Sequence, residues 1–168
     1  MIGLEIQANF AGLDKFTKNL LLALDVGLQT ATTEVELIAI EEVLVQDAYD
    51  TYALMESIYT STFGASTYDQ KVAMATDALE NNPTKWPAIR NARQGTVPFL
   101  EVDPQVVSDS RYDAWVAVAA SHGKYVENGY ISWYKNWVPA RPFWQATVDR
   151  AVPVVLQILN DAVNAAIP

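Results

Sequence analysis

Six carboxylates in the first third of the chain are the residues whose type and spacing could do chemistry. They are Glu34, Glu36, Glu41, Glu42, Asp47 and Asp50. Glu34 and Glu41 are seven residues apart and would share one face of a helix, which could suit a metal ion or an acid–base pair. Neither a histidine nor a further ligand stands at coordinating spacing from them. We therefore favour a solvated acidic helix face, and we expect no metal and no cofactor.

The single histidine, His122, lies in a Ser-His-Gly turn. A hydrolytic triad would need a nucleophile on a strained turn such as Gly-x-Ser-x-Gly, and the sequence has none. It also lacks the Gly-x-Gly-x-x-Gly, phosphate-loop and His-Glu-x-x-His motifs. We expect a loop role for His122, no catalytic residues, and a protein that is not an enzyme.

Seven aromatic residues gather in a stretch of twenty. They are Tyr125, Tyr130, Trp133, Tyr134, Trp137, Phe143 and Trp144. Such a cluster could stack sugars or single-stranded bases, or it could anchor a protein interface. The acidic charge balance counts against bases. We rank a protein interface first, a core role second and a sugar platform third, so a free-standing module that binds glycan or protein is the alternative function.

A C-terminal helix is predicted from about Phe143 to Ala166. Pro142 suits its first position, where the missing N–H costs nothing. At about 100° per residue, the polar residues form one stripe. This stripe consists of Asp149, Arg150, Pro153, Gln157, Asn160, Asp161 and Asn164.

The apolar arc of this helix spans roughly 200°, against the ~100° that a helix on a single core needs. It consists of Trp144, Val148, Ala151, Val152, Val155, Leu156, Ile158, Leu159, Ala162, Val163 and Ile167. Such a helix is either enclosed in its own domain or packed with one flank on a neighbouring subunit. We favour the neighbouring subunit, with an interface formed by Pro139, Arg141, Pro142, Phe143, Trp144, Val148, Val152, Leu156 and Leu159.

The rest of the chain predicts a mixture of helices and strands. Residues 2–10 alternate apolar and polar, as in a half-buried strand. An apolar stripe from Leu13 to Tyr59 indicates one long helix with a defect or two helices end to end. We favour two, the second beginning at the capping-box pair Thr33 and Glu36.

Further along, residues 61–67 are predicted to form a loop and residues 67–81 a short helix. An irregular segment follows at 82–96. A weak edge strand is expected at 97–102, and the strongest strand, buried on both faces, at 111–120.

Composition and charge limit the possible classes. The 168 residues are 51% hydrophobic and 18% charged, which suits one globular domain. No apolar run is long enough to span a bilayer, no secretory signal is evident, and no cysteine is present. With a net charge of −9, the chain lacks the basic footprint of a specific nucleic-acid binder. Residues 1–60 hold two bases and ten acids, whereas residues 84–150 hold eight bases and six acids.

Two segments resemble a known family. Tyr125-Val-Glu-Asn-Gly129, followed by Pro139-Ala-Arg-Pro-Phe143 at the start of a helix, is similar to the tail-completion (minor tail component) proteins at the head–tail neck of long-tailed bacteriophages. The entry Phe10-Ala-Gly-Leu-Asp-Lys-Phe16 also resembles that family. The similarity covers residues 1–30 and 111–167, and residues 62–95 look like an insertion within a single domain, 1–168.

The resemblance implies an α+β fold, a small antiparallel sheet packed by a long N-terminal helix, continuous or broken, and a C-terminal helix. It also implies a structural virion protein that forms a homo-oligomeric ring, of six or twelve copies, assembled in the host cytoplasm. Adjacent neck and tail proteins would be its other partners, with no membrane involved. The ring would complete the tail or join it to the head, and DNA would pass through without specific binding.

Two hypotheses follow about how the residues serve that role. Carboxylates lining a channel repel phosphates, so the acids of residues 34–56 are expected to face the lumen or the next ring. Pro139, Arg141, Pro142 and Phe143 would set the entry angle of the last helix, and we expect Arg141 to pair with Glu127.

Overall fold

The computed structural model describes residues 11–47, 52–81, 100–131 and 135–167. In chain order, its elements are α1 (Ala11–Val45), α2 (Ala53–Glu56), β1 (Ile58–Thr62), β2 (Ala65–Ser66), α3 (Tyr68–Asn81), β3 (Trp115–Val118), α5 (Gly123–Asn128), β4 (Tyr130–Ile131), β5 (Trp137–Val138) and α6 (Phe143–Ala166). The predicted strand at 2–10, the irregular segment at 82–96 and the residues Asp50, Trp133 and Tyr134 lie outside the described residues.

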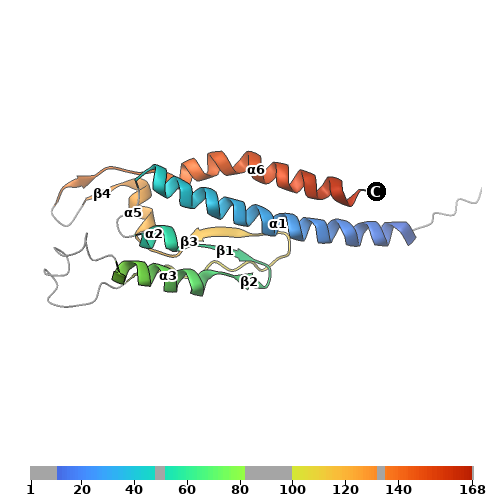
Figure 1. Ribbon diagram of the computed structural model, residues 1–168, viewed down its shortest axis with the longest axis horizontal. Coiled ribbons are helices and arrows are strands. Elements are labelled where there is room, and N and C mark those ends of the chain that lie inside the picture. Colours follow the sequence, from blue (N-terminus) through green and yellow to red (C-terminus); the bar gives the residue numbers. More distant parts are fainter. Residues whose placement is uncertain (1–10, 48–51, 82–99, 132–134, 168) are drawn as a thin grey trace, which may run out of the picture.

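The fold is α+β, as predicted. Strands β2, β1 and β3 form a small antiparallel sheet in that order, and β4 and β5 form a separate hairpin. Figure 1 shows α1 on one side of the sheet and α3 on the other, with α6 lying along the far side of α1. The elements therefore stack in the order α6, α1, sheet, α3, and the main core lies where α1, α2, α3 and the strands meet.

Helix α1 is continuous, so the prediction of two helices meeting at Thr33 was wrong. The threonine cluster does not interrupt it because the hydroxyl groups bond within the helix. Thr30 Oγ1 donates to the Val26 carbonyl (2.9 Å), and Thr33 Oγ1 donates to the Gln29 carbonyl (3.0 Å). Each hydroxyl is satisfied one turn back, so Thr33 caps nothing.

Strand β1 is the main element that the sequence did not reveal. Tyr59 was expected on a helix and 61–67 in a loop, whereas Ser61 pairs with Ser66 across a β1–β2 hairpin that turns at Phe63 and Gly64. Ile58 and Tyr59 are both buried because the central strand is covered on its two faces. The Tyr59 hydroxyl accepts a hydrogen bond from the Val106 N–H (2.8 Å), which ties the loop after residue 100 to the sheet.

Strand β3 is shorter than the predicted 111–120, and its four residues are exposed or half-buried instead of buried on both faces. Trp115 and Tyr112 are exposed. Residues before Trp115 turn because the Asp113 carboxylate accepts hydrogen bonds from the Ser108 hydroxyl (2.6 Å) and the Ser110 N–H (3.2 Å). The predicted edge strand at 97–102 is represented among the described residues by a single antiparallel bridge between Val102 and Ala120.

Helices α3 and α6 confirm their predictions. Helix α3 ends at Asn81, and α6 has the predicted bounds, although Pro142 precedes the first helical residue instead of being it. All seven residues of the predicted polar stripe of α6 are exposed. Helix α6 runs antiparallel to α1 (Figure 1), and the two make the most extensive contact between elements in the described part of the chain.

Candidate functional site

The two segments that carry the family resemblance meet in space where α6 begins. We call this junction the corner; it comprises residues 126–129 and 138–145. The Arg141 N–H donates to the Val126 carbonyl (2.9 Å). The carboxylate of Glu127 accepts the backbone N–H groups of Trp144 (2.8 Å, Oε2) and Gln145 (3.1 Å, Oε1). The corner thus fixes the direction in which α6 leaves the hairpin.

Glu127 acts as the N-terminal cap of α6 from a distant position in the sequence. The first turn of a helix has free N–H groups and a positive dipole end, which a carboxylate stabilises. Pro142, the residue at the cap position, makes no side-chain cap hydrogen bond. The cap therefore comes from α5, 17 residues before Trp144.

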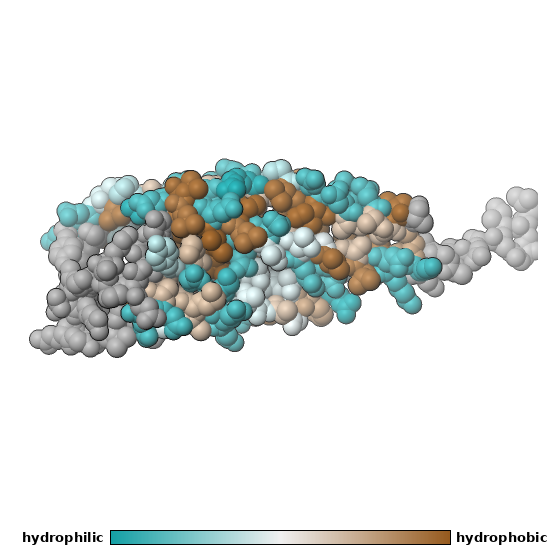
Figure 2. Space-filling model, in the orientation of Figure 1, coloured by the Kyte–Doolittle hydropathy of each residue, from teal (hydrophilic) through white to brown (hydrophobic). Residues whose placement is uncertain are grey.

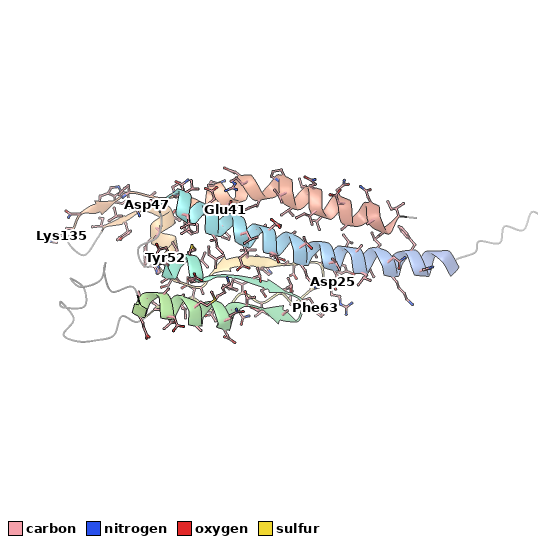
Figure 3. The ribbon with its side chains drawn as sticks, in the orientation of Figure 1. Asp25, Glu41, Asp47, Tyr52, Phe63 and Lys135 are labelled. Carbon is pink, nitrogen blue, oxygen red and sulfur yellow. The ribbon has the colours of Figure 1, made fainter. Side chains whose placement is uncertain are left out.

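The expected Arg141–Glu127 pair was wrong. Glu127 is used by the helix backbone, and the Arg141 guanidinium donates instead to the main-chain carbonyl of Asp47, at the end of α1. Figure 3 shows Asp47 where α1 ends beside this junction. Arg141 thereby links the start of α6 to the end of α1.

Gly129 lets two chain segments approach closely at the corner. Its backbone has φ +73° and ψ 163°, a region that is open almost only to glycine. A Cβ there would lie 2.8 Å from the Val138 carbonyl oxygen and 2.9 Å from the Ala140 nitrogen. The glycine of the Tyr-Val-Glu-Asn-Gly segment is therefore required by geometry.

Helix α6 buries one flank and exposes the other. Phe143, Thr147 and Ala151 are buried. Three residues spaced four apart point away from the chain: Val148 is 42% exposed, Val152 50% and Leu156 64%. We call these three residues the α6 flank. Figure 2 shows hydrophobic atoms gathered along the two long helices on the face in view.

The other residues of the predicted interface have different environments. Pro139 and Pro142 are exposed, and Arg141, Trp144 and Leu159 are half-buried. Phe143 is only 2% exposed and belongs to the core, so its side chain is not available to a neighbour. Its contribution is to fix the first turn of α6.

The predicted face of free carboxylates is largely used inside the chain. Glu36 pairs with Lys71 of α3 (2.5 Å). Arg150 of α6 pairs with Glu42 (2.5 Å) and Glu41 (2.8 Å), and these hydrogen bonds, Glu42 first, raise the pKa of Arg150. Glu42 is 5% exposed and cannot line a channel. Burial counts against the lumen hypothesis for Glu42, and Glu36 is half-buried in its pair with Lys71. Glu41 and Asp47 are exposed and Glu34 is half-buried, so the hypothesis stays a prediction for these residues.

The aromatic cluster divides between the core and a surface patch. Phe143 and Trp144 pack edge to face at the start of α6, with ring centroids 6.3 Å apart. Tyr125, Ile131 and Trp137 are exposed around α5 and the β4–β5 hairpin, Trp137 to 64%. His122 immediately precedes α5, in agreement with a loop role.

The described residues contain no group of three acidic or histidine side chains that could hold a metal ion. In the same part of the chain, no helix has the length and apolar character needed to cross a membrane. The whole chain matches no protein-family model, no curated protein and no solved structure. Membership of the phage neck family, which the sequence resemblance implies, therefore remains a prediction.

Replacing Glu127 with alanine tests the cap. We expect Glu127→Ala to lower the free energy of unfolding by about 1 kcal/mol, the usual value of a lost N-cap. Urea denaturation measures this, and hydrogen exchange should quicken at the amides of Trp144 and Gln145. Glu101→Ala, at an exposed loop carboxylate, is the control and should change neither quantity. Equal effects of the two substitutions would contradict the assignment.

Replacing Gly129 with alanine tests the close approach. Gly129→Ala should destabilise the fold more than Gly64→Ala does. Both glycines have positive φ, which costs an alanine about 1–2 kcal/mol. Only Gly129 adds a collision with backbone, since a Cβ at Gly64 would meet nothing within 4 Å. Thermal denaturation of the two variants measures the difference, and equal losses would refute the explanation.

Proposed function

We propose that this protein is a structural subunit that assembles into a homo-oligomeric ring through α6. The observation that carries the proposal is the exposed α6 flank, Val148, Val152 and Leu156. Covering an exposed apolar side chain of this size gains about 1 kcal/mol or more. A neighbouring subunit that covered all three would therefore gain several times RT from this contact alone.

The rigidity of α6 supports an assembly role. Its first turn is capped by Glu127, its entry is tied to α1 by Arg141, and Arg150 bonds two glutamates of α1. A surface that is ordered before binding loses little conformational entropy when a partner covers it. The flank is thus suited to a permanent contact.

The resemblance supplies the place of assembly, the head–tail neck of a long-tailed phage virion. The segments that carry it form the corner, which determines how α6 is presented. An overall charge of −9 is compatible with a ring through which DNA passes without sticking. We assign no lumen role to Glu42, because it is buried in its pair with Arg150.

A charge placed on the flank tests the assembly. Leu156→Glu should shift the purified protein from an oligomer to a monomer, because a carboxylate would be desolvated in the interface. Light scattering after size-exclusion chromatography measures the mass. Gln157→Glu adds the same charge one residue away on the polar stripe and should leave the oligomer intact.

A monomeric wild-type protein at high concentration would contradict the assembly, as would an oligomer that tolerates Leu156→Glu. The neck assignment has its own observation. Capsid and tail genes beside the coding sequence would support it, and electron microscopy of the particle should then place the protein between head and tail.

A binding module remains the second candidate, because Trp137, Ile131 and Tyr125 are exposed together. If that is the function, tryptophan fluorescence should change on titration with oligosaccharides, and Trp137→Ala should abolish the change. Trp115→Ala, at another exposed tryptophan on β3, is the control. Because the assembly proposal includes no sugar binding, we expect the tryptophan fluorescence of the wild-type protein to show no saturable change on this titration.

A further inference from the structure

Helix α1 extends well beyond the end of its partner α6. A Cβ at Gly27 would lie 3.0 Å from the Cβ of Ala162, so these two residues face each other across the antiparallel pair. Helix α6 ends four residues later, at Ala166. Residues 11–22 of α1 therefore have no α6 beside them, a length of about 18 Å at 1.5 Å per residue. We call this segment the overhang; Figure 1 shows it continuing past the C-terminal end of α6.

The overhang carries exposed leucines. Leu21 and Leu22 are both exposed, Leu22 to 65%, and Val26 continues the exposed surface one turn later. Phe16 and Leu20 are half-buried. At about 100° per residue, Leu22 and Val26 lie on a side of α1 that is turned away from Gly27, the residue that faces α6. The exposed leucines therefore form a second apolar surface, distinct from the contact between the two helices.

The overhang also has a distinctive charge. Residues 11–22 hold Lys15 and Lys18, both exposed, against the single acid Asp14, so the overhang has a net charge of +1 in an otherwise acidic first third of the chain. The α6 flank is bordered by Asp149, which is exposed, whereas Arg150 is already paired with Glu41 and Glu42. A basic, leucine-bearing helix end and an apolar flank beside a carboxylate are complementary in both apolar character and charge.

We propose that the overhang of one copy packs against the α6 flank of a second copy. This rests on the proposed assembly and names the surface that covers the flank. A flank-to-flank dimer would hide Leu156 but would leave Leu22 in water. Contact between the overhang and the flank covers both, and because the two surfaces differ, repetition of the contact can close a ring.

The absence of cysteine from the chain makes this contact directly measurable. Two single-cysteine proteins, Leu22→Cys and Leu156→Cys, are given tags of different length, mixed, and treated with a short bismaleimide. A cross-linked product carrying both tags must form between copies, and we expect it to dominate. Leu37→Cys mixed with Leu156→Cys is the matched control, since Leu37 is an exposed leucine of α1 outside the overhang.

Each other outcome overturns the proposal. Products of Leu156→Cys alone would show flank-to-flank pairing, products of Leu22→Cys alone would show paired overhangs, and preferential reaction of Leu37→Cys would move the contact along α1. Oligomers without any cross-link would refute this contact while the assembly stands. A monomeric wild-type protein would refute both.

Charge reversal gives an independent measurement. Lys15→Glu with Lys18→Glu should weaken self-association at least tenfold at low salt, and the difference from wild type should shrink as salt screens the charges. Lys124→Glu with Lys135→Glu, two exposed lysines at the hairpin end, is the matched control and should have no such effect. Equal effects of the two pairs would attribute the change to net charge and refute the contact.

Discussion

The first turn of α6 needs acceptors for its free N–H groups, and the geometry of the corner depends on how they are supplied. The residue before the helix is Pro142, which offers no side-chain cap. The carboxylate of Glu127 takes this role, and it reaches the helix only because Gly129 permits the close passage of the two segments. The direction in which α6 leaves the corner follows from this polar contact.

Further contacts along α1 keep α6 from rotating about its own axis. Arg141 donates a hydrogen bond to the end of α1, and Arg150 pairs with Glu41 and Glu42 in the second half of α1. At the other end of the contact, Gly27 has no side chain, so Ala162 of α6 can pack closely against it. Glu42 is buried and would be costly without its cation. With these contacts in place, α6 cannot turn Leu156 inward without breaking the ion pairs with Arg150, so the flank stays exposed in a single subunit.

How far the sequence predicted this structure depended on whether the signal was local. Helices α3 and α6 were predictable because apolar periodicity and flanking prolines lie within each segment. The continuity of α1 was not predictable from the sequence, because the hydroxyl of Thr33 could either cap a new helix or donate to the Gln29 carbonyl. The structure shows the second of these two hydrogen bonds. Strand β1 was missed because Ser61 and its polar neighbours do not alternate with apolar residues. Ser61 is buried and its neighbours are half-buried between layers that the sequence does not show as adjacent. The Glu127 cap joins segments 17 residues apart, so spacing alone could not identify it.

The symmetry of an assembly depends on whether an exposed surface packs against the same surface of a second copy or against a different one. A flank that met only its own copy would give a closed dimer, because a two-fold contact uses the same surface twice. Here α1 is 35 residues long and α6 is 24, and α1 carries a second, different apolar surface near its free end, where Leu21 and Leu22 are exposed. Two unlike surfaces that each lack cover favour a head-to-tail contact, and in the proposed ring the direction that the corner gives α6 would then set the curvature.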